Sequence, residues 1–193
     1  MTTRFWWVRH SPTHETALVG WRDVPADLSD HARIARLDAF LPKAALLISS
    51  DLIRATATAA ELQAGRHALP PTPALREFNF GDWDGKRFDE VAQSHPKLSR
   101  DYWERPGDIA PPGGESWNAA SARVAVQVAQ LAAAHKGRDL ILVAHFGVIL
   151  TQLQTALGCS PAQALGHKID PWSVTRLALD PQGWRMELIN HLA

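Results

Sequence analysis

Short apolar runs alternate with amphipathic stretches along the chain. Residues 5–8, 45–48 and 140–144 are almost uninterrupted apolar runs, which is typical of strands buried in the middle of a parallel sheet. Residues 28–41 and 116–135 carry apolar side chains at three- and four-residue spacing, and each stretch has a serine or aspartate near its start that can cap a helix. The alternation of strands and helices predicts an α/β fold, a three-layer α/β/α sandwich around a mostly parallel central sheet.

Turn-forming residues separate these elements. Proline and glycine are frequent at 66–73 and 106–114, where we expect loops. Towards the C-terminus, residues 173–179 and 184–190 have the pattern of two strands, joined by a turn at 180–183. No internal repeat or low-complexity segment interrupts this organisation.

The first predicted strand ends at two adjacent residues that carry chemistry. Arg9 and His10 follow residues 5–8, and the turn-forming pair Ser11-Pro12 ends the strand. An arginine and a histidine that are shielded from water cost free energy unless an anion binds to them. The simpler alternative is the solvated start of a loop.

A second strand end places an arginine at the start of a helix. Residues 45–48 are followed by Ser49, Ser50 and Asp51, which are all suited to cap a helix, and Arg54 falls in the first turn of that helix. A cation at a helix N-terminus opposes the helix dipole, and a bound anion removes the conflict. Taken alone, the position favours the simpler interpretation that Arg54 points into water.

A third strand end carries a histidine. His145 follows the apolar run 140–144, where the chain turns into another apolar stretch that we expect to be helical. A single histidine in such a position is more often a satisfied core residue than a catalytic one. Ligands of open α/β sheets, however, bind outside the carboxyl ends of the strands, so the three strand ends can converge on one site. Two arginines and two histidines around one anion predict a phosphoryl-binding pocket.

Five segments carry distinctive motifs: Arg9-His10, residues 49–55 (SSDLIRA), 75–85 (LREFNFGDWDG), 111–116 (PPGGES) and 143–145 (VAH). In this order they resemble the motifs of the histidine phosphatase superfamily, the phosphoglycerate mutase-like phosphatases. The resemblance covers nearly the whole chain and implies the phosphoglycerate mutase-like fold. Within the family, the motifs at 75–85 and 111–116 look most like those of α-ribazole phosphatase.

The resemblance implies a role for each site residue. His10 is the nucleophile that takes up the phosphoryl group as phosphohistidine, and Arg9, Arg54 and His145 hold the equatorial oxygens. Glu77 is the acid that protonates the leaving oxygen and later the base that activates water. These roles agree with physical chemistry, because nearby arginines disfavour protonation of a histidine and phosphoryl transfer depends mainly on alignment and charge stabilisation.

Three other carboxylates are alternatives to Glu77 as the acid. Asp82 and Asp84 lie in the same motif, and Glu15 lies in the loop after His10. The glycine-bounded stretch 81–85 is equally typical of a polar turn with no catalytic role.

Several positions complete the expected site, and some depart from the family. The phosphate- and substrate-binding residues that the resemblance implies are Arg9, Thr13, Thr16, Gly20, Arg54, His145 and Phe146. Ser11 stands where the family has glycine after the nucleophilic histidine, and Thr16 replaces a loop asparagine. Phe146 stands where glycine normally follows the second histidine, and its ring either forms a wall of the pocket or turns back into the core.

Composition limits the other function classes. Lysine plus arginine and aspartate plus glutamate each number 20, so the chain has no excess charge to attract nucleic acid or a membrane. The single cysteine, Cys159, excludes an internal disulfide and suits a reducing compartment. No apolar run is long enough to cross a membrane. We therefore expect the protein to be cytoplasmic. We expect one domain, residues 1–193, that buries about 70% of the surface of the unfolded chain, as a monomer or homodimer.

No cofactor and no metal are expected. His10 and His14 are four residues apart, but Pro12 between them is incompatible with the helix that would bring both to one ion. The chain has neither a Gly-x-x-x-x-Gly-Lys phosphate loop nor a dinucleotide-binding fingerprint. The expected partner is a small, soluble phosphate ester.

The leading interpretation is a metal-independent phosphoric monoester hydrolase of the histidine acid phosphatase type, with α-ribazole 5′-phosphate as the substrate that the motif similarity implies. The alternatives are phosphotransfer of the phosphoglycerate mutase type and an inactive phosphate-binding sensor. The mutases are expected to be longer, with added segments over the pocket, and to carry threonine before Gly20-Trp21, where this chain has Val19. Both points favour a phosphatase, and the intact His10 and Glu77 argue against a sensor.

Overall fold

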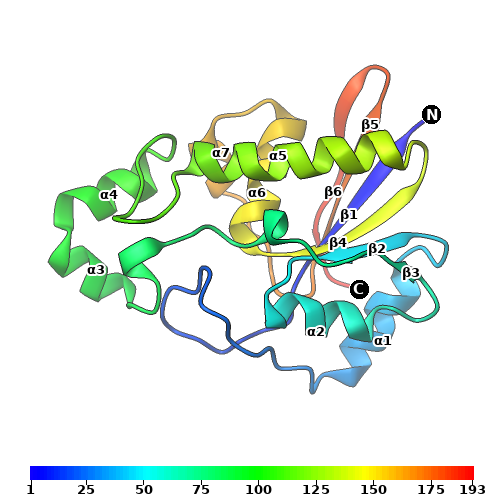
Figure 1. Ribbon diagram of the computed structural model, residues 1–193, viewed down its shortest axis with the longest axis horizontal. Helices are drawn as coiled ribbons and strands as arrows, with labels where there is room; N and C mark the ends of the chain where they lie inside the picture. Colours follow the sequence, from blue (N-terminus) through cyan, green and yellow to red (C-terminus); the bar gives the residue numbers. More distant parts are fainter.

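A six-stranded sheet with the order β3-β2-β4-β1-β5-β6 forms the centre of the structure, a computed structural model that describes residues 1–193 (Figure 1). Strands β1, β2, β3 and β4 run parallel, whereas β5 is antiparallel to both of its neighbours, β1 and β6. The predicted mostly parallel sheet is therefore confirmed. The strands are β1 (Thr3–Arg9), β2 (Leu46–Ser49), β3 (His67–Ala68), β4 (Asp139–Ala144), β5 (Val174–Asp180) and β6 (Gly183–His191).

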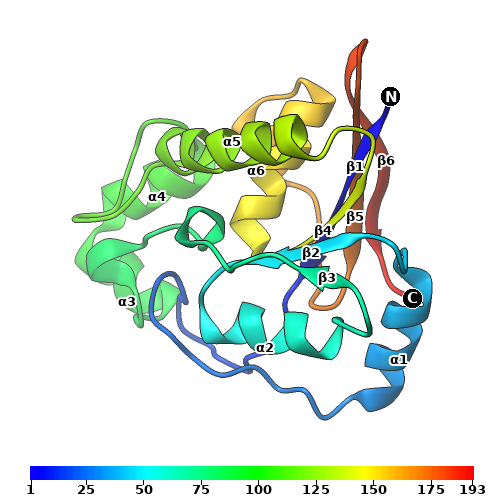
Figure 2. The same cartoon turned by 45° about the vertical axis from the view of Figure 1, so that its right-hand side comes forward.

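Helices cover both faces of the sheet, which confirms the three-layer sandwich (Figures 1 and 2). In β1, Phe5 and Trp7 face a core of 26 buried residues that includes side chains of α5 (Trp117–Ala134) and α6 (Phe146–Leu157). Trp6 and Val8 face a second core of 14 buried residues that includes side chains of α1 (His31–Phe40) and α2 (Ile53–Glu61). Because both faces of the strand are buried, its sequence is an apolar run rather than an alternating pattern.

The helix starts confirm two predicted caps and correct a third. Asp30 accepts a hydrogen bond from Arg33 N at the start of α1, and Ser116 accepts one from Ala119 N at the start of α5. Helix α2 is different, because its N-cap is Leu52 and not one of the three polar residues before it. The Ile53 N–H donates instead to Asp23 Oδ1 at 2.7 Å, so a distant loop caps this helix.

Several short elements lie where the sequence predicted loops or gave no clear pattern. The region 66–73 contains the edge strand β3, and α3 (Phe88–Ser94), α4 (Pro96–Glu104) and α7 (Pro161–Leu165) were not predicted. Two 3-10 helices, Pro73–Leu75 and Gly81–Trp83, flank the segment that contains Glu77. Helices α3 and α4 project to one side of the sheet, beyond the end of α5 (Figures 1 and 2).

The three predicted strand ends meet at one edge of the sheet. Strands β2, β4 and β1 are neighbours and parallel, so the chain leaves all three at the same edge. The His10 N–H donates to Ala144 O at 3.0 Å and the Ser50 N–H to Val143 O at 3.0 Å, which continues the sheet pairing to this point. None of the helices combines the length and the apolar character that a membrane crossing requires.

Candidate active site

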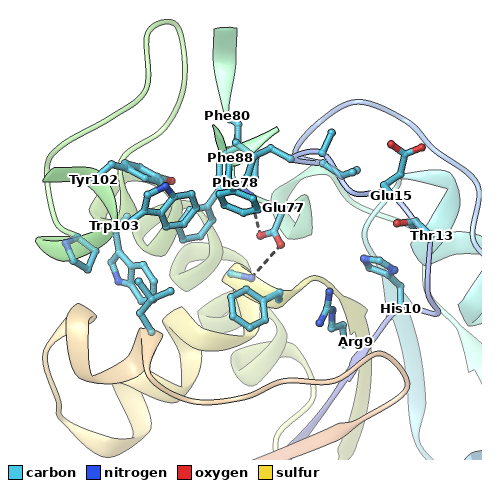
Figure 3. Close-up of a pocket in the computed structure, with 18 of the residues that line it drawn as sticks. Arg9, His10, Thr13, Glu15, Glu77, Phe78, Phe80, Phe88, Tyr102 and Trp103 are labelled. Atoms are coloured by element: carbon cyan, nitrogen blue, oxygen red, sulfur yellow. Dashed lines mark hydrogen bonds between the residues drawn. The ribbon is translucent and has the colours of Figure 1, made fainter. Parts of the chain in front are cut away.

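A cavity of about 260 Å³ opens at the end of β1 and contains most of the predicted site residues. Arg9, His10, Thr13, Arg54 and Glu77 all line it. Figure 3 shows Arg9, His10 and Thr13 on one side of the cavity and Glu77 across from them. Residues from three distant parts of the chain therefore face one enclosed space.

His10 is held as a neutral imidazole in one tautomer. Its Nδ1 lies 2.7 Å from the Ser11 carbonyl oxygen, and since a carbonyl can only accept, Nδ1 carries the proton. Nε2 therefore keeps its lone pair. Burial, the charge of Arg54 and, to a smaller extent, that of Arg9 lower the pKa of His10 to about 3, so the ring is neutral at physiological pH.

His145 lies beside His10 and has no hydrogen-bond partner. The two ring centroids are 5.0 Å apart, and the side chain of His145 is fully buried at the N-cap of α6. Neither ring nitrogen is hydrogen-bonded. Burial and the neighbouring His10 and Arg54 hold the pKa of His145 well below its usual value. A buried imidazole without a partner is costly, so its position is best explained by a ligand that supplies the missing bond.

The two arginines bring positive charge into the cavity without a carboxylate hydrogen-bonded to either. Arg9 donates to Ile169 O at 2.6 Å, and its Nε is buried without a partner. Arg54 is 1% exposed and donates to Gly20 O at 2.7 Å and to Arg22 O at 3.1 Å. The interpretation that Arg54 points into water is therefore wrong. Burial lowers the pKa of both guanidinium groups, and both remain charged.

A carboxylate outside the cavity positions the carbonyls that hold Arg54. Asp84 accepts hydrogen bonds from Gly20 N at 3.0 Å and from Arg22 N at 2.8 Å, which fixes the loop whose carbonyls bind Arg54. These two hydrogen bonds occupy the Asp84 carboxylate. The other two alternatives to Glu77 lie elsewhere: Asp82 is exposed, and Glu15 pairs with Arg22 at 2.8 Å. Of the four carboxylates considered, Glu77 is the buried one that lines the cavity.

The Glu77 carboxylate lies at the N-terminus of α6. Its Oε2 accepts a hydrogen bond from Gly147 N at 3.1 Å and its Oε1 one from Phe78 N at 3.0 Å (dashed in Figure 3). Burial raises the pKa of the carboxyl, and these two N–H groups and the arginines only partly oppose the shift. A carboxyl with a raised pKa facing a cavity is suited to donate a proton.

A second network fixes the backbone of Glu77, and the sequence did not predict it. Arg123, on α5, donates to Arg76 O at 2.9 Å and to Glu77 O at 3.3 Å, while it pairs with Glu115 at 2.8 Å. Trp21 Nε1 donates to Glu77 O at 2.8 Å. The only sequence signal for Arg123 was an arginine on an otherwise apolar stretch of an alanine-rich helix.

Close backbone contact explains the glycines of the two motifs around Glu77. A Cβ at Gly81 would lie 2.1 Å from Pro112 O, and a Cβ at Gly114 would lie 2.4 Å from Asn79 O. Gly81 also has a φ of +52°, which side-chain-bearing residues rarely adopt. The loops 75–85 and 111–116 can therefore pack backbone against backbone, and this contact supports the segment that carries Glu77.

Comparison with known proteins identifies the family. The chain matches the histidine phosphatase superfamily (branch 1) over residues 5–192. The chain belongs to the histidine phosphatase superfamily. The resemblance read from the five motifs is therefore confirmed.

The relatives that match in sequence include a much longer protein and proteins of similar length. The chain is 33% identical over 140 residues to the bifunctional protein Rv2228c of Mycobacterium tuberculosis, a match that covers 72% of this chain and 36% of that one, so the chain spans about a third of that relative. It is 28% identical over 188 residues to a 2,3-bisphosphoglycerate-dependent phosphoglycerate mutase of Xanthobacter autotrophicus, covering 90% of this chain and 91% of the mutase. The expectation that the mutases are longer than this chain is therefore wrong, because this mutase has nearly the same length.

Solved structures of phosphatases share the whole fold. The mycobacterial glucosyl-3-phosphoglycerate phosphatase Rv2419c superposes with a TM-score of 0.86 at 26% identity, covering 98% of this chain and 99% of that chain. The α-ribazole phosphatase of Shigella flexneri superposes with a TM-score of 0.84 at 21% identity, covering 98% and 97% of the two chains, which shows a common fold.

The positions that depart from the family pattern are accommodated in different ways. Ser11 is fully buried, and its Oγ lies 3.3 Å from Thr58 Oγ1, so the extra side chain packs against α2. Phe146 lines the cavity, with the Arg9 guanidinium 5.4 Å from its ring centroid, which answers the question of where the ring points. Thr16 is exposed and does not line the cavity, and Gly20 reaches the site through the carbonyl that binds Arg54.

Gly147 offers a test of how Glu77 is positioned. A Cβ at this position would lie 2.7 Å from Glu77 Oε1 and 3.1 Å from the Phe78 ring. We expect Gly147→Ala to displace the carboxyl and to lower kcat/KM for alkyl phosphates by about 10²-fold, the lower end of what general acid catalysis contributes. The loss for 4-nitrophenyl phosphate, whose leaving group needs no proton, should be several times smaller. Gly107→Ala, where φ is not positive and an added Cβ would lie 3.9 Å from the Asn118 side chain, is the control, and equal losses on both substrates would contradict the prediction.

Proposed function

We propose that the protein is a phosphomonoesterase that hydrolyses a small phosphate ester through a phosphohistidine on His10. The observation that carries the proposal is the hydrogen bond from His10 Nδ1–H to the Ser11 carbonyl, which leaves Nε2 free in a cavity lined by two arginines. The family membership and the phosphatases among the structural neighbours support the same reaction.

The first step transfers the phosphoryl group to His10. The Nε2 lone pair attacks phosphorus, and the bond to the ester oxygen breaks while Glu77 gives its proton to that oxygen. In the proposed step Arg9, Arg54 and His145 stabilise the charge on the equatorial oxygens; the two arginines line the cavity, and His145 lies beside the His10 ring. The positive charge that the phosphorylated ring acquires is stabilised by the Ser11 carbonyl at Nδ1.

The second step reverses the roles of the acid. Glu77, now a carboxylate, takes a proton from a water molecule, whose oxygen attacks phosphorus while the bond to Nε2 breaks. His10 returns to its neutral form, Glu77 is protonated again, and orthophosphate leaves. Both states of Glu77 are needed, which agrees with a pKa that is raised but still opposed by two N–H donors.

One residue of the cavity lining argues against the mutase alternative. Val19, which replaces the threonine of the mutases, lines the cavity and offers no hydroxyl to a substrate carboxylate. The sensor alternative requires a site without catalytic groups, whereas His10 and Glu77 both face the cavity. α-Ribazole 5′-phosphate, which the motif similarity implied, is one substrate to include in a turnover screen.

Replacing Glu77 tests the proposed acid. Glu77→Gln should lower kcat/KM for an alkyl phosphate by about 10²–10⁴-fold and that for 4-nitrophenyl phosphate much less. His10→Ala should abolish turnover of both esters. Asp82→Asn, in the same motif but exposed, is the control and should retain activity. A loss in Asp82→Asn, or full activity in Glu77→Gln, would rule out Glu77 as the acid.

The dependence of activity on pH follows from the same two groups. In the wild type, kcat/KM for an alkyl phosphate should fall as pH rises through the raised pKa of Glu77, because the acid form is lost. It should also fall at low pH, as His10 is protonated near its pKa of about 3 and loses its lone pair. In Glu77→Gln the fall at high pH should disappear, and its persistence would assign it to another group.

We further propose that the reaction needs no metal ion. Two guanidinium groups line the cavity beside His10, and in this proposal they supply the stabilisation that Mg²⁺ supplies in other phosphoryl transfers. Dialysis against a chelator should leave kcat unchanged, and a loss of activity that one divalent ion restores would contradict this assignment.

A further inference from the structure

The cavity extends from the arginines into a compartment walled by aromatic rings. Eleven of its 19 lining residues are hydrophobic. Apolar cavities of about 150 Å³ are known to bind benzene, so a cavity of about 260 Å³ can hold a phosphoryl group and one ring. The aromatic lining residues, from here on the aromatic compartment, are Phe78, Phe80, Phe88, Tyr102, Trp103, Trp117 and Phe146.

Trp103 packs against three other rings of this compartment. Its ring centroid is 4.7 Å from that of Tyr102, 5.7 Å from Phe88 and 6.2 Å from Phe80. Tyr102 and Trp103 come from α4 and Phe88 from α3, the two helices that project beyond α5. Figure 3 shows Tyr102 and Trp103 on the side of the cavity opposite His10 and Arg9. The rings are therefore placed to meet the leaving group and not the phosphoryl group.

The charges of the cavity do not favour an anionic leaving group. Arg9 and Arg54 are its only lysine or arginine residues, and both lie on the phosphoryl side. The other charged lining residues are the carboxylates Glu15 and Glu77. A carboxylate or a second phosphate would be desolvated against ring faces, which carry partial negative charge, with no cation to pair with it.

One polar group of the compartment lacks a partner. The Tyr102 side chain is 4% exposed, and its hydroxyl is buried without a hydrogen bond. Burial, with the nearby charges of Glu77 and Glu115, raises the pKa of this hydroxyl, so it remains an O–H donor. A ligand that carries an acceptor would satisfy it.

We propose that the aromatic compartment binds the organic part of the ester and selects an uncharged, ring-bearing alcohol that offers a hydrogen-bond acceptor to Tyr102. This inference rests on the proposed phosphatase function and adds the class of substrate. It excludes esters of carboxylate-bearing alcohols, such as phosphoglycerates, as preferred substrates.

Four esters with alkyl leaving groups separate ring, charge and acceptor. Benzyl phosphate supplies the ring alone, 4-acetylbenzyl phosphate adds a neutral acceptor, 4-carboxybenzyl phosphate replaces that group by a charged one of similar size, and glycerol 3-phosphate lacks the ring. We expect kcat/KM for the acetyl ester to exceed that for the carboxy ester by at least about tenfold. Equal values would overturn the proposed selection against charge.

Two substitutions assign the selection to this compartment. Trp103→Leu should lower kcat/KM for benzyl phosphate by about 2–13-fold and that for glycerol 3-phosphate less. Tyr102→Phe should lower kcat/KM for 4-acetylbenzyl phosphate by about 2–13-fold without a comparable loss for benzyl phosphate. Trp184→Leu, at a half-buried tryptophan outside the cavity, is the matched control and should leave all ratios unchanged. Uniform losses on every ester in both cavity variants would show packing roles alone.

Binding of phosphonates separates this inference from the proposed function. Benzylphosphonate and 4-carboxybenzylphosphonate cannot be hydrolysed at their P–C bond, so calorimetry compares them without turnover. Preference for benzylphosphonate over 4-carboxybenzylphosphonate with no hydrolysis of any ester would overturn the phosphatase function and keep the binding class. Turnover of 4-nitrophenyl phosphate with equal binding of both phosphonates would overturn the substrate class and keep the phosphatase function.

Discussion

Two positive charges, on Arg9 and Arg54, lie largely out of water at the end of the parallel strands, and their hydrogen-bond partners are backbone carbonyls. A buried charge of this kind is tolerated when an anion completes its environment. The same charges, together with burial, lower the pKa of His10 and His145 and so keep both rings neutral. Both features agree with the proposed function, in which the cavity binds a phosphate dianion and the nucleophile His10 must not be protonated.

Two hydrogen-bond networks outside the cavity hold Arg54 and Glu77 in position. Asp84 holds the loop whose carbonyls bind Arg54, and Arg123 with Glu115 holds the backbone of Glu77. Neither Asp84 nor Arg123 lines the cavity. Their substitution should therefore act through the position of Arg54 or of Glu77, because both residues hold parts of the backbone around the cavity.

The sequence revealed those parts of the site that follow from strand ends. Apolar runs that stop at Arg9 and at Ala144 predict where β1 and β4 end, and parallel pairing then brings His10 and His145 to one edge. It could not reveal contacts made across long separations in the chain. Asp23 caps α2 across 30 positions, and Arg123 reaches the carbonyl of Glu77 across 46. Helices α3 and α4 were missed because they are short and mostly polar, with few apolar side chains to reveal a helical period.

Isolation of the covalent intermediate on His10 tests the proposed mechanism most directly. The enzyme would be mixed with a good substrate such as 4-nitrophenyl phosphate, quenched in alkali within the first turnover and analysed by peptide mass spectrometry. We expect one phosphoryl group on the His10 side chain, formed at least as fast as steady-state turnover, and none in His10→Ala. Steady turnover with no phosphorylated His10, or a phosphoryl group on another residue, would contradict it.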